Sequence, residues 1–181
     1  MKYKVTPASL PDVLVLEPVS SWDEFGILSF DLRAFHEATQ TSVKFVQDNH
    51  SRSLKGVLRG LHYQIQQPQG KLISVVSGRV LDVTVDLRRS SPHFGNWASV
   101  ELSESNAKQL WIPPGFAHGF LVLSDSADVL YKTTEYYAPQ FERCIAWNDP
   151  AIGIEWSDGV KPLLSEKDQA GVSLATAEVF A

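Results

Sequence analysis

The sequence has little cysteine, no excess of basic residues and no long apolar run, and each shortage excludes a class of protein. Cys144 is the single cysteine, so no disulfide can form within the chain, and a lone thiol is typical of a reducing cytoplasm. Lysine and arginine number 16 against 21 acidic residues, which argues against a nucleic-acid partner. No run approaches the roughly 20 apolar residues of a membrane span, and residues 1–13 lack the core of a signal peptide. We therefore expect a cytoplasmic globular protein that engages neither nucleic acid nor membrane.

What the sequence does contain is a succession of short β-strand patterns. Between residues 43 and 137 apolar stretches follow one another, and Gly, Pro, Ser or Asn separates most of them. In residues 81–88 apolar and polar side chains alternate, which places them on opposite faces of one strand. Many short strands without intervening helices predict an all-β antiparallel sandwich or barrel.

We expect one domain over residues 1–181, with a core at about 43–150, N-terminal strands in 1–42 and a C-terminal segment in 151–181. A short helix is expected at residues 31–40, with Asp31 as its N-cap, and a helical turn at 166–170. The last ten residues are mostly small, and we expect them to form a mobile tail.

Three basic side chains of different character lie close together in residues 56–78. They are Arg59, His62 and Lys71: arginine is a permanent cation, histidine is the residue type that titrates near neutral pH, and lysine is a mobile point charge. Together they can hold an anion and move a proton. Arg59 and His62 are three residues apart, so a regular strand would send them to opposite faces. Both can enter one pocket only if the strand is kinked, and Gly60 is where a bulge can sit.

A second turn, in residues 111–120, carries a Pro-x-Gly-x-x-His pattern that ends at His118. This pattern is the second signature of the cupin jelly roll, in which the turn aims the histidine into the barrel. Metal-binding cupins add a His-x-His and a glutamate in the first signature, but residues 62–64 read His-Tyr-Gln and no carboxylate follows before Gly78. Two histidines are too few for the three or four ligands of a catalytic metal, so we predict the fold without a metal.

A histidine that acts as a base needs an orienting partner and a nearby acid. Asp168 and Asp82 are the candidate partners of His62, and Tyr131 and Tyr136 are the candidate acids. From spacing alone, a solvated carboxylate is the commoner role for Asp168, and packing is as common as catalysis for the tyrosines.

Several long stretches of the chain resemble the nucleotide-sugar epimerases typified by dTDP-4-dehydrorhamnose 3,5-epimerase. They cover most of residues 43–168 and read FVQDNHSRSLKGVLRGLHYQ, QGKL, DVTVDLRRSSPHFG, QLWIPPGFAHGFLVLS, LYKTTEYYAPQFER, WNDPAIGIEW and LLSEKD. The resemblance implies a cupin-type β-barrel with a few short helices, a homodimer, and no metal or other cofactor. It implies an isomerase of deoxysugar and surface-polysaccharide biosynthesis whose substrate is a nucleoside-diphosphate 4-keto-6-deoxyhexose.

The resemblance also implies roles for the matching residues. His62 is the base, Asp168 holds it, Tyr131 is the acid on the opposite face of the sugar, and Lys71 lies near the C4 ketone oxygen. The implied substrate-binding residues are Arg59, Gln47 and Asn49 at the diphosphate or sugar, His118 and Asp82 in the sugar pocket, and Tyr136 near the nucleobase.

The chemistry of such a reaction suits these residue types. A ketone at C4 acidifies the hydrogens on C3 and C5, a neutral histidine can remove one, and a carboxylate on its other nitrogen fixes the tautomer. A donor at the ketone oxygen stabilises the enolate. Inversion then needs a proton from the other face, and therefore a second residue.

One stretch departs from the family pattern. The family usually carries Asp-x-Arg-Gly-Phe-Phe with a glutamate soon after, whereas residues 22–30 read WDEFGILSF, with Phe25 in place of the arginine and no glutamate. Phenylalanine cannot replace a bidentate phosphate clamp, and Arg33 or Arg52 is a candidate substitute. This departure indicates a divergent member, for which inversion at C3 only or C5 only, on another nucleotide sugar, stays open. A non-catalytic sugar-nucleotide-binding cupin and a cupin isomerase that moves the keto group are the alternatives.

Overall fold

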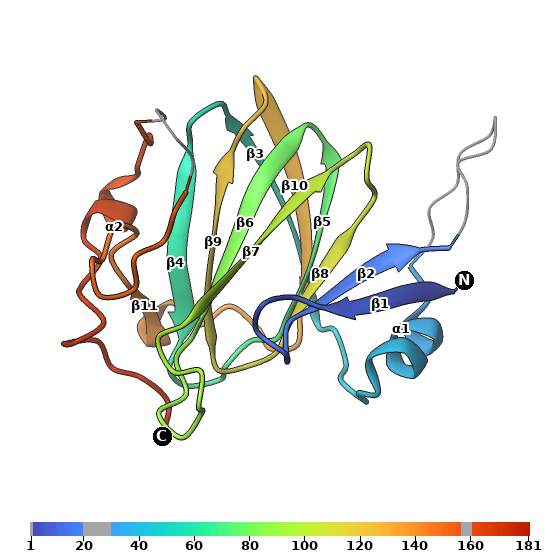
Figure 1. The fold of residues 1–181 in the computed structure, drawn as a ribbon, viewed down its shortest axis with the longest axis horizontal. Coiled ribbons are helices and arrows are strands. Elements are labelled where there is room, and N and C mark those ends of the chain that lie inside the picture. Colours follow the sequence, from blue (N-terminus) through green and yellow to red (C-terminus); the bar gives the residue numbers. More distant parts are fainter. Residues whose placement is uncertain (1, 20–29, 157–160) are drawn as a thin grey trace.

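The computed structural model describes residues 2–19, 30–156 and 161–181. Their strands form two antiparallel sheets that face each other as a flattened barrel (Figure 1). The six-stranded sheet runs in the order β1 (Tyr3–Pro7), β2 (Leu14–Pro18), β8 (Gln109–Ile112), β5 (Lys71–Ser77), β10 (Ser126–Thr133), β3 (Gln47–Leu54). The five-stranded sheet runs β11 (Glu142–Cys144), β4 (Leu58–Gln64), β9 (Phe116–Val122), β6 (Arg79–Asp86), β7 (Trp97–Ser103). The predicted all-β antiparallel barrel is confirmed.

Helices are short and lie outside the barrel. α1 (Leu32–Thr39) starts where the Asp31 carboxylate accepts hydrogen bonds from two backbone N–H groups of the first turn, as the sequence predicts. α2 (Glu166–Gln169) follows a capping box at Ser165, and a 3₁₀ turn covers Pro139–Phe141. In Figure 1, α1 lies beside β1 and β2, and α2 lies beside β4 on the opposite side of the barrel. No helix in the described ranges is long and apolar enough to cross a bilayer.

Strand β6 shows how the sequence pattern builds the interior. Its apolar residues Val83 and Val85 pack under the C-terminal segment, and its polar residues Asp82 and Thr84 occupy the opposite face. Both sets are fully buried, because the C-terminal segment covers the apolar face. The carboxylate of Asp82 therefore lies inside the barrel.

Residues 172–181 do not form the free tail that their composition suggests. Ala177 is buried, Val172 bridges to Ile145, and Phe180 bridges to Arg88. The ring of Phe180 also packs edge-on against Tyr63, with the ring centroids 6.0 Å apart. Small side chains let this segment lie close against the five-stranded sheet. The composition that suggested a mobile tail is therefore explained by close packing.

Candidate active site

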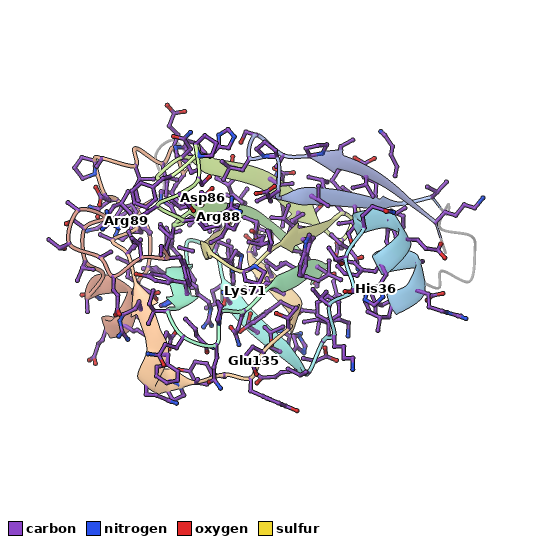
Figure 2. The ribbon with its side chains drawn as sticks, turned by 90° about the horizontal axis from the view of Figure 1, so that it is seen from below. His36, Lys71, Asp86, Arg88, Arg89 and Glu135 are labelled. Atoms are coloured by element: carbon purple, nitrogen blue, oxygen red, sulfur yellow. The ribbon has the colours of Figure 1, made fainter. Side chains whose placement is uncertain are left out.

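A cavity of about 380 Å³ lies in the interior of the barrel. Eight of the ten predicted site residues line it: Gln47, Asn49, Arg59, His62, Lys71, His118, Tyr131 and Asp168. They come from both sheets and from α2. In Figure 2, Lys71 lies near the centre of the molecule, between the strands. The cavity is thus a convergence of residues that are distant in sequence.

A kink in β4 brings Arg59 and His62 to the same face. The pairing register of β4 with β9 shifts between these two residues. Gly60 lies at the shift with a φ of +137°, and a Cβ there would stand 2.6 Å from the Cα of Gly119. Only glycine combines this backbone conformation with so close an approach. The kink expected at Gly60 is therefore confirmed.

His62 and Asp168 form a hydrogen-bonded pair, with Nε2 of the imidazole 2.7 Å from Oδ1 of the carboxylate. Asp168 is 4% exposed and also accepts hydrogen bonds from the backbone N–H of Gly60 and the hydroxyl of Ser165. Burial alone would raise the pKa of Asp168, but the hydrogen bonds from His62, Ser165 and Gly60 lower it overall. The residue is a fixed carboxylate rather than a solvated one.

This pairing leaves Nδ1 of His62 as the ring nitrogen that makes no hydrogen bond to another described residue. With the Nε2 proton donated to Asp168, Nδ1 carries the lone pair of the neutral imidazole. Among the described residues, Nδ1 is a buried polar atom without a hydrogen-bond partner, and it lies 3.4 Å from Oε1 of Glu142. An imidazole held in this way is arranged to accept a proton at Nδ1.

Several further residues line this cavity that the sequence did not identify as site residues, and three of them, Glu142, Tyr137 and Lys167, form a hydrogen-bonded group. The Glu142 carboxylate accepts a hydrogen bond of 2.7 Å from the hydroxyl of Tyr137 and another from the ammonium of Lys167. Burial would raise the pKa of Glu142, but these two donors lower it overall. These residues lie in the stretches LYKTTEYYAPQFER and LLSEKD. Their polar side chains within those stretches are the feature by which the sequence could have identified them as site residues.

Tyr136 does not lie in the cavity, where the resemblance places it. It is exposed and does not line the cavity, whereas its neighbour Tyr137 does. Strand β10 ends at Thr133, so the alternation of faces does not continue to residue 136. The Gln47 side chain accepts a hydrogen bond from the backbone N–H of Tyr137 and fixes the turn that follows the strand.

Lys71 is a buried cation beside a second histidine–aspartate pair. Burial lowers the pKa of Lys71 to about 8, although Asp82 and Glu142 act in the opposite direction. Nε2 of His118 lies 3.0 and 2.9 Å from the two carboxylate oxygens of Asp82. Asp82 is fully buried behind His118, so it neither lines the cavity nor partners His62. Its predicted place in the pocket wall is corrected to a place behind that wall.

Tyr131 projects into the barrel from the opposite sheet to His62. Its Cα neighbours are Asn49 on β3 and Ile73 on β5. Burial raises the pKa of the phenol, with Arg59 acting in the opposite direction, so Tyr131 keeps its proton at neutral pH. A protonated phenol is a proton donor, and it lines the same cavity as His62, which comes from the other sheet.

Polar side chains on the cavity face of β3, among them Gln47, Asn49 and Ser53, lie next to Arg59. Gln47 donates a hydrogen bond of 2.8 Å to Asn49, and Nε of Arg59 donates one of 3.0 Å to the hydroxyl of Ser53. Phe25, which stands at the usual arginine position, lies outside the described residues. Neither Arg33 nor Arg52, the two candidate substitutes for that arginine, lines the cavity. Arg33 forms an ion pair with Asp31, and Arg52 forms one with Asp128.

One group in the described part of the chain has ligand atoms close enough for a metal ion: His62, Cys144 and Asp168, within 4.8 Å of one another. The His62–Asp168 hydrogen bond already occupies one ligand atom from each of those two residues. Burial raises the pKa of the Cys144 thiol to about 11, which disfavours the thiolate that metals bind. The donor set therefore does not fit a resident metal.

Comparison with known proteins gives a consistent result. A family model described as dTDP-4-dehydrorhamnose 3,5-epimerase matches residues 7–176. The protein of that name from Pseudomonas aeruginosa is 55% identical over 98% of this chain and 99% of its own length. The protein of the same name from Shigella flexneri is 52% identical over 97% of this chain and 98% of its own.

Solved structures with the same fold have been determined with nucleotide sugars bound. The dTDP-6-deoxy-D-glucose-3,5-epimerase of Legionella pneumophila, in complex with dTDP-4-keto-L-rhamnose, superimposes with a TM-score of 0.93. It is 47% identical and covers 97% of this chain and 95% of its own. A 3′-monoepimerase of Streptomyces bikiniensis, in complex with dTDP-quinovose, has a TM-score of 0.87 and 35% identity, and the match covers 94% of this chain and 87% of that one.

Proposed function

Because the chain belongs to the dTDP-4-dehydrorhamnose 3,5-epimerase family, we propose that its cavity inverts C3 and C5 of a dTDP-linked 4-keto-6-deoxyhexose. Membership makes the protein an isomerase of dTDP-rhamnose biosynthesis. The observation that supports the chemistry is the paired geometry of His62 and Tyr131. His62, held by Asp168 and with its Nδ1 unbonded, and Tyr131, with a protonated phenol, line one cavity from opposite sheets.

The proposed reaction has two proton transfers. Nδ1 of His62 takes a proton from C3 or C5, the electrons of that C–H bond form an enolate with the C4 ketone, and Asp168 stabilises the imidazolium. The ammonium of Lys71 stabilises the enolate oxygen. Tyr131 then donates its proton to the same carbon from the other face, which inverts the centre. A positioned acid or base contributes about 10²–10⁴ in rate.

The remaining polar residues suit the nucleotide end of the substrate. We propose that Arg59 and Lys167 contact the diphosphate, since both cations line the cavity. Tyr137 takes the role near the nucleobase that the resemblance implies for Tyr136. His118, oriented by Asp82, lines the sugar pocket, and Gln47 and Asn49 supply hydrogen bonds beside Arg59.

We also propose that residues 1–181 form one domain and that the protein is a homodimer. Strands β1 and β2 extend the six-stranded sheet instead of forming a separate unit, which supports the first proposal. Leu54, Val76 and Leu130 are exposed on β3, β5 and β10. Their alternation along the strands places all three on the outer face of that sheet, where a second copy can cover them.

Incubation with dTDP- and UDP-linked 4-keto-6-deoxyglucose in deuterated water, followed by proton NMR, tests the activity. We expect the H3 and H5 signals of the dTDP sugar to disappear faster than in a protein-free control, with an inverted product. Exchange at one carbon only identifies a monoepimerase, and a new ketone position identifies a keto isomerase. Binding of both nucleotide sugars without exchange above the control contradicts the proposal and identifies a binding protein.

A further inference from the structure

The cavity has one apolar wall, and Phe120 forms it. Apart from Gly119, Phe120 is the only lining residue in the described ranges whose side chain contains no polar atom. It is 4% exposed and belongs to the apolar core of the barrel, together with Ile73 and Val129. Phe120 therefore lies at the boundary between the polar cavity and the apolar core.

The apolar residues Phe120 and Ile73 lie two residues along their strands from His118 and Lys71, which line the sugar pocket in the proposed function. Phe120 follows His118 by two residues on β9, and Ile73 follows Lys71 by two residues on β5, so each pair shares a face. Ile73 is paired with Tyr131, which packs against the same core cluster. An apolar layer is thus adjacent to the layer of Lys71 and His118.

Given the proposed function, we infer that Phe120 packs against the C6 methyl group of the sugar and selects 6-deoxy sugars over 6-hydroxy sugars. In that function Lys71 meets the oxygen on C4. The methyl group is attached to C5, the carbon next to C4, and must therefore lie beside the lysine. The apolar layer at Phe120 is where a methyl group is accommodated without loss of a hydrogen bond.

The expected selectivity is moderate. A hydroxyl placed against the Phe120 ring gives up its hydrogen bonds to water, and neighbouring Asp82 is already bonded to His118. An apolar pocket disfavours a ligand with one added hydroxyl by at most about 10². We therefore expect a preference between about 10-fold and 100-fold for the 6-deoxy ligand.

Isothermal titration calorimetry with dTDP-quinovose and dTDP-glucose measures this preference. The two ligands differ at C6 by one hydroxyl, and both lack the C4 ketone, so neither is turned over. The wild type should bind dTDP-quinovose at least about 10-fold more tightly. In Phe120→Leu, which shortens the wall and leaves room for a hydroxyl, the ratio of the two dissociation constants should fall at least threefold. Phe116→Leu is the matched control: Phe116 lies on the same strand and is equally buried, but does not line the cavity, so its ratio should stay at the wild-type value.

A wild-type ratio below about tenfold, or a ratio that Phe120→Leu leaves at the wild-type value, overturns the inference. The wild-type comparison decides the matter even if a variant fails to fold. Binding of dTDP itself separates the two proposals. If the wild type does not bind dTDP, the proposed function fails, whereas tight dTDP binding without discrimination at C6 contradicts only the role of Phe120.

Discussion

Lys71 is a cation in a place that disfavours charge, and this gives the proposed reaction a pH dependence. Burial lowers the pKa of Lys71 to about 8, so the ammonium is present below that pH and is lost above it. If the ammonium stabilises the enolate, kcat should fall as the pH rises through about 8. Lys71→Met should lose about 10²–10³ in kcat, as removal of one oxyanion donor does, and should lack this alkaline limb. A wild-type profile that stays flat to pH 10 contradicts the role of Lys71.

Individual residues were predictable where a motif surrounds them. His62, Arg59 and Lys71 stand in one short stretch of contrasting basic residues, and the structure brings all three to the cavity. Glu142 was missed because it lies in a three-residue strand that has no pattern of its own. Its place is set by pairing with Gln64 on β4, and such pairing is not visible in sequence.

At the scale of elements, the kink in β4 is the feature on which the site depends. Gly60→Ala should destabilise the fold by more than about 2 kcal/mol, because its Cβ would meet backbone in a positive-φ conformation. Urea unfolding measures the change. Gly153→Ala is the control, since φ there is also positive but the nearest atom is 4.0 Å away, and it should cost about 1 kcal/mol. Equal losses in the two variants would mean that the close approach to Gly119 is unimportant.

The strands themselves were largely predictable, because alternation and turn residues mark them. Strand β7, at Trp97–Ser103, is one of the strands within the succession of apolar stretches between residues 43 and 137. That succession begins at residue 43, but strand β3 begins only at Gln47, because Val43 and Phe45 pack in the cluster beneath α1. The sequence alone does not show whether apolar residues before a strand belong to that strand or pack against a helix outside the sheet.

At the scale of the whole molecule, the C-terminal segment carries Asp168 to a histidine 106 residues earlier in the chain. Spacing favoured a solvated Asp168 carboxylate and composition favoured a mobile tail, and both expectations fail for one reason. The segment is fixed along the five-stranded sheet by bridges at Leu163, Val172 and Phe180, which only the closed barrel provides. The resemblance to a family supplied what local pattern could not.

The same docking makes Asp168 a source of acid sensitivity. Its pKa is lower in the folded state than in the unfolded chain, so its stabilisation is present above the unfolded value of about 4 and is lost as the pH falls below it. In Asp168→Asn, the loss of stability between pH 5 and 2 should be less steep than in the wild type. Urea unfolding at several pH values measures this, with exposed Asp125→Asn as control. Equal slopes in wild type and Asp168→Asn contradict the assignment.

The apolar outer face of the six-stranded sheet makes a prediction about assembly. If a second copy covers Leu54, Val76 and Leu130, size-exclusion chromatography with light scattering should give twice the chain mass of 20.1 kDa at micromolar concentration. Leu130→Asp should shift the protein toward the monomer, because it places a charge in the covered surface. A wild-type monomer under these conditions contradicts the homodimer.

The central claim is that His62 removes the proton and Tyr131 returns it from the opposite face. Deuterium exchange at C3 and C5 of dTDP-4-keto-6-deoxyglucose, followed by proton NMR, tests both halves in one measurement. His62→Ala should reduce exchange to the protein-free rate, whereas Tyr131→Phe, which keeps the base, should retain exchange and lose the inverted product. Exchange near the wild-type rate in His62→Ala, or inverted product at the wild-type rate in Tyr131→Phe, would contradict the account.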